Sequence, residues 1–278
     1  ARRHTDGSLT ALRDTPIRDM MTFRNCMAAE PGARRGFFRA AAVTFCVAVL
    51  GGFFSQRAAF AQAEIPQKPS AIKMAWGDQG DGTFVNPIVP ADYSDLDAIR
   101  VGNDYYAISS TFQYSPGVII LHSTDLVNWT ILGHAVDDLA AISPEMNWDH
   151  MNRYGRGIWA GAIRYHEGKF WIYFGTPDEG FFMTAAKNPA GPWEPLHHVM
   201  DAKGWDDCCP FWDDDGQGYL VCTNFSGKYA IHLFKLTPDG TQIAPRFDKI
   251  IHQSRGSEAN KLYKINGMYY HYFSKVKP

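Results

Sequence analysis

Three carboxylic acids stand at nearly the same place in a repeated sequence pattern. Asp95, Asp207 and Glu258 lie 10, 12 and 11 residues ahead of a tyrosine that follows a polar, glycine-containing turn. In a fourth copy of the pattern the corresponding position holds Ala162. Carboxylates brought together repel one another and raise each other's pKa, so a protein that tolerates this cost usually uses it. The pattern therefore predicts a functional site built on carboxyl groups of altered proton affinity.

The repeat itself indicates how the chain positions these acids. Each copy is a polar turn followed by an aromatic residue and an apolar run, which is typical of a β-hairpin. The aromatic anchors are 65, 49 and 50 residues apart, at Tyr105, Phe170, Tyr219 and Tyr269. Recurring hairpins at about this period predict a β-propeller with one four-stranded blade per repeat, although aromatic hairpins also occur in other β proteins. The first strand of each blade lines the propeller's channel, so acids from three blades could converge at one end of it.

The first 61 residues are typical of an export signal. Arg34-Arg-Gly-Phe-Phe-Arg39 precedes an apolar run of 15 residues, 40–54, and Ala59-Phe-Ala61 offers a cleavage site of the A-x-A kind. The run is short of the roughly 20 residues that span a bilayer as a helix. We therefore predict a signal peptide and upstream residues over 1–61, with a leading arginine pair that resembles a twin-arginine signal. The competing interpretation is a buried helix of the folded domain.

Loss of this leader changes the charge and the cysteine content of the chain. The leader carries 9 arginines and 4 acidic residues, so the remainder has 18 basic and 25 acidic residues and a net charge of −7. An acidic, exported protein is a poor candidate for binding nucleic acid, and no membrane segment is expected after the leader. Cys208, Cys209 and Cys222 remain, an odd number that predicts no disulfide framework. No zinc-binding motif is present.

The rest of the chain is organised by its β pattern. Residues 62–83 are predicted to be a linker, and no long stretch of helical periodicity follows it. Trp129 and Trp193, each 23 or 24 residues after an anchor, and the turn Pro238-Asp-Gly240 mark the approach to the outer strands of three blades. Residues 137–157 form a longer insertion before the second blade. Long loops in compact domains are often part of a site.

Several motifs together resemble the glycoside hydrolases of family 43. The resemblance covers about residues 84–278, and its motifs agree with the family in both order and spacing. The motifs are Asn86-Pro, Tyr93-Ser-Asp95, Arg100-Val-Gly-Asn-Asp-Tyr-Tyr106, Ser110-Thr-Phe112, Ser115-Pro-Gly117, Gly157-Ile-Trp-Ala160, Ile163-Arg-Tyr-His166, Asp207-Cys-Cys-Pro-Phe-Trp-Asp-Asp-Asp-Gly216 and Ser257-Glu258-Ala-Asn-Lys-Leu-Tyr-Lys264.

The resemblance implies a fold and a set of roles. The family is a five-bladed β-propeller that cleaves xylosides and furanosides with inversion, so Asp95 stands at the general base and Glu258 at the general acid. Asp207 stands at the third carboxylate, which orients the acid and would raise its pKa as a neighbouring anion. Because Asp206 directly precedes Asp207, the third carboxylate could instead be Asp206. Phe112 and Trp159 could form walls of the sugar pocket or simply pack between blades.

The resemblance also bounds what this chain contains. Four hairpins are present, so we expect an all-β chain of the five-bladed type with about four blades, over 84–278 and incomplete at its C-terminus. Relatives can hold a central calcium with a late histidine from the part not present, so no metal or other cofactor is assigned.

The predicted function is that of an exported glycosidase. We expect it to be periplasmic or extracellular and to trim xylose or arabinofuranose from plant cell-wall polysaccharide. The alternatives are a propeller that binds oligo- or polysaccharide without cleaving it, and a protein-binding propeller, which gives no reason for acids at one blade position.

Overall fold

The computed structural model describes residues 77–150 and 152–275 of the 278-residue chain. The predicted leader, 1–61, and most of the predicted linker lie outside these residues. The last part of the predicted linker, together with the residues after it, holds a two-stranded hairpin, β1 (Gly77–Asp78) and β2 (Phe84–Val85). No helix in the described part of the chain is long and apolar enough to cross a membrane.

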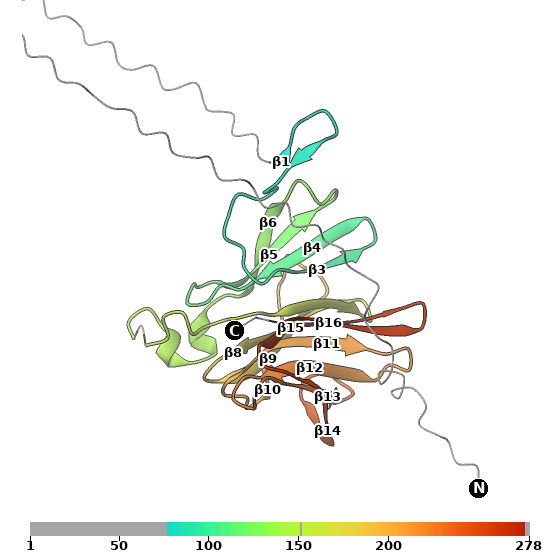
Figure 1. The fold of residues 1–278 in the computed structure, drawn as a ribbon. Coiled ribbons are helices and arrows are strands. Elements are labelled where there is room, and N and C mark those ends of the chain that lie inside the picture. Colours follow the sequence, from blue (N-terminus) through green and yellow to red (C-terminus); the bar gives the residue numbers. More distant parts are fainter. Residues whose placement is uncertain (1–76, 151, 276–278) are drawn as a thin grey trace, which may run out of the picture. The chain divides into compact units, whose positions relative to one another are not determined.

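Three four-stranded antiparallel sheets follow one another along the chain (Figure 1). The first contains β3 (Asp97–Val101), β4 (Asp104–Ser109), β5 (Gly117–Ser123) and β6 (Thr130–Val136). The second contains β7 (Ala162–His166), β8 (Lys169–Thr176), β9 (Gly180–Ala186) and β10 (His197–Met200). The third contains β11 (Trp205–Trp212), β12 (Gly218–Asn224), β13 (Ala230–Leu236) and β14 (Ile243–Gln253). Each is a meander in chain order, as a propeller blade requires.

A fourth hairpin, β15 (Ser257–Ile265) and β16 (Met268–Lys275), forms a two-stranded sheet. All four predicted hairpins are therefore present. Two of them close through two-residue turns in which both residues have positive φ, Glu167-Gly168 (48° and 77°) and Asn266-Gly267 (52° and 77°). Such turns match the right-handed twist of the strands they join.

The first strands of the sheets contact one another across the repeat. β3 packs against β7, β7 against β11, and β11 against β15. This arrangement brings the residues at the start of each first strand into one region, which is where the predicted acids stand. In its described residues, the long insertion between the first two sheets contains two short 3-10 helices, η2 (Leu139–Ala141) and η3 (Pro144–Met146).

Two apolar clusters hold the sheets together. One contains Ile108 and Ile120 of the first sheet with Ile163 and Phe174 of the second. The other contains Tyr173, Phe181 and Met183 of the second sheet with Leu220 and Phe234 of the third. The second sheet is thus covered on both faces, and for this reason every residue of β9 is buried. A strand buried on both faces needs a continuous apolar run rather than an alternating one, and β9 reads Gly-Phe-Phe-Met-Thr-Ala-Ala.

Candidate active site

The predicted site residues surround one cavity of about 780 Å³. Four successive repeats contribute to its wall. The lining residues are Asp95, Phe112, Arg156, Trp159, Ala160, Pro177, Lys203, Gly204, Trp205, Asp206, Asp207, Phe225, Ser226, Glu258 and Ala259. All five residues singled out from the sequence, Asp95, Asp207, Glu258, Phe112 and Trp159, are among them. The sequence pattern thus locates a common cavity, while the chemical roles of these residues remain predictions.

Asp95 lies two residues before β3 and is exposed to the cavity. Its backbone is in the left-handed region, with φ of 55°, which turns the carboxyl away from the strand that follows. The hydroxyl of Ser110 donates to Oδ2 at 2.6 Å, and the hydroxyl of Ser94 donates to the same atom at 3.3 Å. A carboxylate fixed in this way, with solvent in front of it, can hold and polarise a water molecule.

Asp207 lies deeper in the cavity, only 8% exposed, at a β-bulge near the start of β11. The pKa of Asp207 is raised to about 6, chiefly by burial, and the carboxyls of Glu258 and Asp95 contribute to the rise. The backbone N–H of Ala259 and the ammonium group of Lys261 act in the opposite direction. Asp207 can therefore change its charge near neutral pH, and its pKa responds to both of the other predicted catalytic acids.

Glu258 is half-buried near the start of β15 and corresponds by register to Asp206 rather than to Asp207. In the strand register, Glu258 lies opposite Ser274 just ahead of a bulge, and Asp206 likewise lies opposite Thr223 just ahead of a bulge. The residue that follows each of them has a backbone in the left-handed region, with φ of 57° at Asp207 and 59° at Ala259. The repeat spacing alone placed Asp207 and Glu258 at one position. The strand register instead aligns Glu258 with Asp206, so Asp207 and Glu258 differ by one residue in their place relative to the bulge.

Asp206 also lines the cavity, and in the sequence it stands out only as the residue before Asp207. It is 4% exposed, and its Oδ1 has no hydrogen-bond partner among the described residues. Burial, followed by the carboxyl of Asp207, raises the pKa of Asp206 well above its usual range, although the backbone N–H groups of Asp207 and Ala160 act against this shift. Gly175 makes room for it, since a Cβ there would lie 2.4 Å from Oδ1. Burial thus favours the protonated form of Asp206 beside the titrating Asp207.

A buried ion cluster lies beside the cavity and was not predicted. Asp97, 3% exposed, accepts hydrogen bonds from the backbone N–H of Ile163 at 2.8 Å and from Nη1 of Arg164 at 2.6 Å. Nζ of Lys261 lies 3.6 Å from the other oxygen of Asp97 and donates to the carbonyl of Gly161 at 3.1 Å. The cluster joins the first, second and fourth hairpins. Because removing one partner would leave a buried charge unpaired, it fixes their relative positions.

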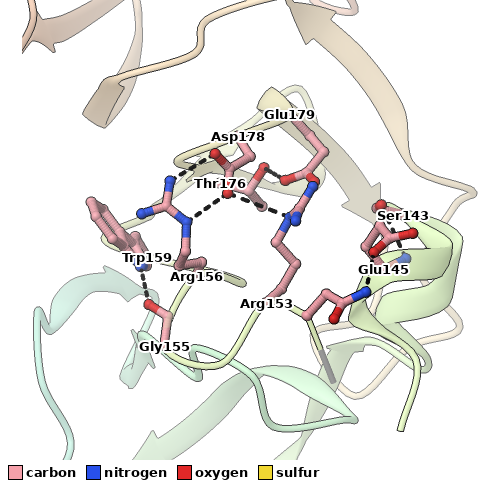
Figure 2. A network of polar contacts seen from close by, with 10 residues as sticks. Ser143, Glu145, Arg153, Gly155, Arg156, Trp159, Thr176, Asp178 and Glu179 are labelled. Carbon is pink, nitrogen blue, oxygen red and sulfur yellow. Dashed lines mark hydrogen bonds and ion pairs between the residues drawn. The ribbon is translucent and has the colours of Figure 1, made fainter. Parts of the chain in front are cut away.

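The insertion predicted to contribute to the site is attached to the cavity wall (Figure 2). Nε and Nη2 of Arg156 contact the two carboxyl oxygens of Asp178 at 2.6 and 2.7 Å. Nε of Arg153 lies 3.1 Å from Glu179 and 3.4 Å from Asp178. Through its side-chain hydrogen bond, Arg156 holds the pKa of Asp178 below its usual value. These pairs fix the insertion against the turn between β8 and β9.

The two predicted aromatic walls are also held by the insertion. The indole Nε1 of Trp159 donates to the carbonyl of Gly155 at 2.8 Å. Phe112 exchanges two backbone hydrogen bonds with Ile158, at 2.8 and 2.9 Å. Gly157 permits this approach, because a Cβ there would lie 2.0 Å from the carbonyl oxygen of Phe112. Both rings are therefore positioned by a segment whose length alone marked it in the sequence.

The described residues contain no group of three or more His, Cys, Asp or Glu side chains arranged to hold a metal ion. The carboxylate of Asp97, beside the cavity, is already paired with Arg164 and Lys261. The three cysteines of this region, Cys208, Cys209 and Cys222, are buried free thiols, in agreement with the prediction that they form no disulfide framework.

The raised pKa of Asp207 gives a prediction about stability. A folded-state pKa of about 6, against a usual 3.8, means that the folded protein loses stability as pH rises from about 4 to 6. Asp207→Asn, which resembles the neutral acid, should therefore match the parent at pH 4 and be more stable at pH 7, by on the order of 1–3 kcal/mol. Thermal unfolding at both pH values measures this.

The matched control for this measurement is Asp92→Asn, since Asp92 is exposed and does not line the cavity. It should leave the difference between the two pH values unchanged. An Asp207→Asn protein that is less stable than the parent at pH 7 would contradict the assignment of a raised pKa.

Comparison with known proteins gives one consistent result. The family model Glycosyl hydrolases family 43 matches residues 84–277. The chain is 40% identical over 207 residues to a beta-xylosidase of Formosa agariphila and 42% identical over 196 residues to a putative beta-xylosidase of Xylanibacter ruminicola. Each alignment covers 70% of this chain and 35% of the relative. A non-reducing end alpha-L-arabinofuranosidase of Bacteroides ovatus is 34% identical over 68% of this chain and 35% of its own length. The chain thus spans about a third of the length of these curated relatives.

Solved structures agree with the fold. A mutant of the GH43 protein BlXynB from Bacillus licheniformis superimposes with a TM-score of 0.59 at 31% identity, covering 69% of this chain and 38% of that one. A xylan beta-1,4-xylosidase from Bacillus halodurans gives a TM-score of 0.57 at 28% identity, covering 67% and 37%. The predicted fold class, an all-β propeller of the five-bladed type with about four blades represented here, is confirmed.

Proposed function

Since the chain belongs to family 43 of the glycosyl hydrolases, we propose that it forms the carboxylate site of an exported glycosidase that removes terminal xylose or arabinofuranose from plant cell-wall polysaccharide with inversion. The observation that carries the proposal is the single cavity lined by Asp95, Asp207 and Glu258. The names of the relatives include both beta-xylosidase and alpha-L-arabinofuranosidase, so both sugars stay within the proposal.

In the proposed reaction Asp95 is the general base and Glu258 the general acid. Water held by the Asp95 carboxylate attacks the anomeric carbon and gives up a proton to Asp95. The bond from that carbon to the leaving oxygen breaks on the opposite face, and Glu258 donates a proton to this oxygen. Water and leaving group then occupy opposite faces of the sugar, which inverts the anomeric centre.

Asp207 is proposed to orient the acid rather than to react. The carboxyl of Glu258 is close enough to contribute to the raised pKa of Asp207. The nearby ammonium of Lys261 favours the ionised form of Asp207, which is the form that can accept a hydrogen bond from a protonated neighbour. Burial also favours the protonated, uncharged form of Asp206 next to it.

Hydrolysis of 4-nitrophenyl β-xyloside and α-L-arabinofuranoside by the full-length gene product tests the activity. Proton NMR of the released sugar in the first minutes identifies the anomer, and a product with the opposite configuration to the substrate supports inversion. Binding to xylan without hydrolysis would instead support a carbohydrate-binding propeller. A product with retained configuration would contradict the assigned roles.

Export is proposed from the leader pattern over residues 1–61. N-terminal sequencing of the protein recovered outside the cytoplasm should begin near Gln62. A mature chain that still contains Phe37 would contradict removal of the leader. With a net charge of −7 after removal, the proposed partner is a polysaccharide and not a nucleic acid.

A further inference from the structure

Arg156 is held in a fixed orientation on the cavity wall before any ligand binds. Two of its three guanidinium nitrogens, Nε and Nη2, form a forked contact with Asp178 at 2.6 and 2.7 Å (Figure 2). A planar guanidinium held by two parallel bonds loses its rotational freedom, so little entropy remains to be lost when it binds something else. The side chain is thus a preorganised donor rather than a freely moving surface arginine.

The third nitrogen of Arg156, Nη1, has no partner within the part of the chain that the structure describes. Arg156 nevertheless lines the cavity, together with Trp159, whose ring is fixed through Gly155 on the same segment. The Arg156 side chain is 47% exposed, whereas Asp207 is 8% exposed. The donor therefore belongs to a more exposed part of the cavity wall than the buried Asp207.

The fixed ring of Trp159 and the fixed N–H donor of Arg156 on one wall are suited to bind a sugar unit. The apolar C–H face of a sugar packs on an aromatic ring, and its hydroxyl groups accept hydrogen bonds. Asp178 already offsets the charge of Arg156, which favours a neutral hydroxyl over an acidic group as the acceptor. Lys203 lines the same cavity and is also exposed, so it supplies a further donor on the cavity wall.

We propose that Arg156, with Trp159, binds the second sugar unit of the substrate, on the leaving-group side of the scissile bond. The proposal rests on the proposed function. The terminal sugar must lie between Asp95 and Glu258, beside the buried Asp207, so the next unit along the chain lies farther out, on the side of the exposed Arg156. Arg156 is then a specificity-determining residue that favours oligosaccharides over substrates lacking a second sugar.

Two arginine variants separate binding from anchoring. Arg153 ties the insertion to Asp178 and Glu179, and Arg156 ties it to Asp178, but of the two only Arg156 lines the cavity. Arg156→Ala should lower kcat/KM for xylobiose at least tenfold more than for 4-nitrophenyl β-xyloside, because a hydrogen bond from a charged donor is worth about that factor. Arg153→Ala should keep the ratio of the two kcat/KM values within about twofold of the parent.

Equal losses on both substrates in Arg156→Ala, or the same change of ratio in Arg153→Ala, would show a purely anchoring role and overturn the proposal. Calorimetric titration provides a readout that does not need hydrolysis. Arg156→Ala should weaken xylobiose binding at least tenfold more than xylose binding, and an unchanged preference overturns the proposal. If the parent hydrolyses neither substrate, the proposed function fails, while the titration still decides the role of Arg156.

Discussion

Replacing Asp95 with alanine is expected to lower the hydrolysis rate of xylosides by about 10³-fold, the usual contribution of a positioned general base. The substitution removes the only group in the proposed mechanism that accepts a proton from the attacking water. The loss should fall on kcat with little change in KM, because the carboxylate contacts the water rather than the sugar. Steady-state kinetics on 4-nitrophenyl β-xyloside measures both parameters.

Asp92→Ala is the control for this substitution. Asp92 lies three residues earlier, is exposed and does not line the cavity, so its loss should leave kcat within twofold of the parent. An Asp95→Ala protein that is folded by circular dichroism and retains more than a tenth of the parent kcat would remove Asp95 from the role of base.

Glu258→Gln should damage hydrolysis in proportion to the basicity of the leaving group. A strongly basic leaving oxygen, such as that of the second sugar in xylobiose, needs a proton as the bond breaks. With xylobiose the expected loss of activity is therefore about 10²–10⁴-fold. With 2,4-dinitrophenyl xyloside, whose leaving group departs as a stable anion, the loss should be less than about tenfold. A series of substituted phenyl xylosides gives the dependence of log kcat on leaving-group pKa, which should be steeper in the variant.

The control variant for this series is Glu167→Gln, since the side chain of Glu167 is 79% exposed and does not line the cavity. Its dependence on the leaving group should coincide with that of the parent. Equal losses across the series in Glu258→Gln would mean that Glu258 binds the substrate or supports the fold but does not donate the proton.

Those parts of the site that follow from periodicity could be predicted from the sequence. Each hairpin has its own turn and aromatic anchor, so the repeat could be recognised from local residues alone. Residues at the starts of first strands converge in any propeller, and this is why Asp95, Asp207 and Glu258 could be placed together. The family motifs added Phe112 and Trp159, which the structure also places on the cavity wall.

The parts that depend on contacts between distant residues could not be predicted. A β-bulge aligns Glu258 with Asp206 instead of Asp207, and nothing local in the sequence marks the bulge. The raised pKa of Asp206 depends on its burial in the folded chain, where Gly175 leaves room for its carboxyl. Arg156 is one of several charged residues in a long insertion, and its fixed orientation becomes visible only when Asp178 is seen opposite it.

The buried ion cluster has a consequence for the order in which the protein folds. Asp97 and Arg164 belong to the first and second hairpins, and Lys261 belongs to the fourth. The complete cluster can form only after the chain has closed its longest loops, and long-range contacts of this kind are slow to form. If the cluster is absent from the folding transition state, its disruption accelerates unfolding and leaves the folding rate nearly unchanged. In that case the lifetime of the native protein, rather than the speed with which it is reached, depends on this one set of charges.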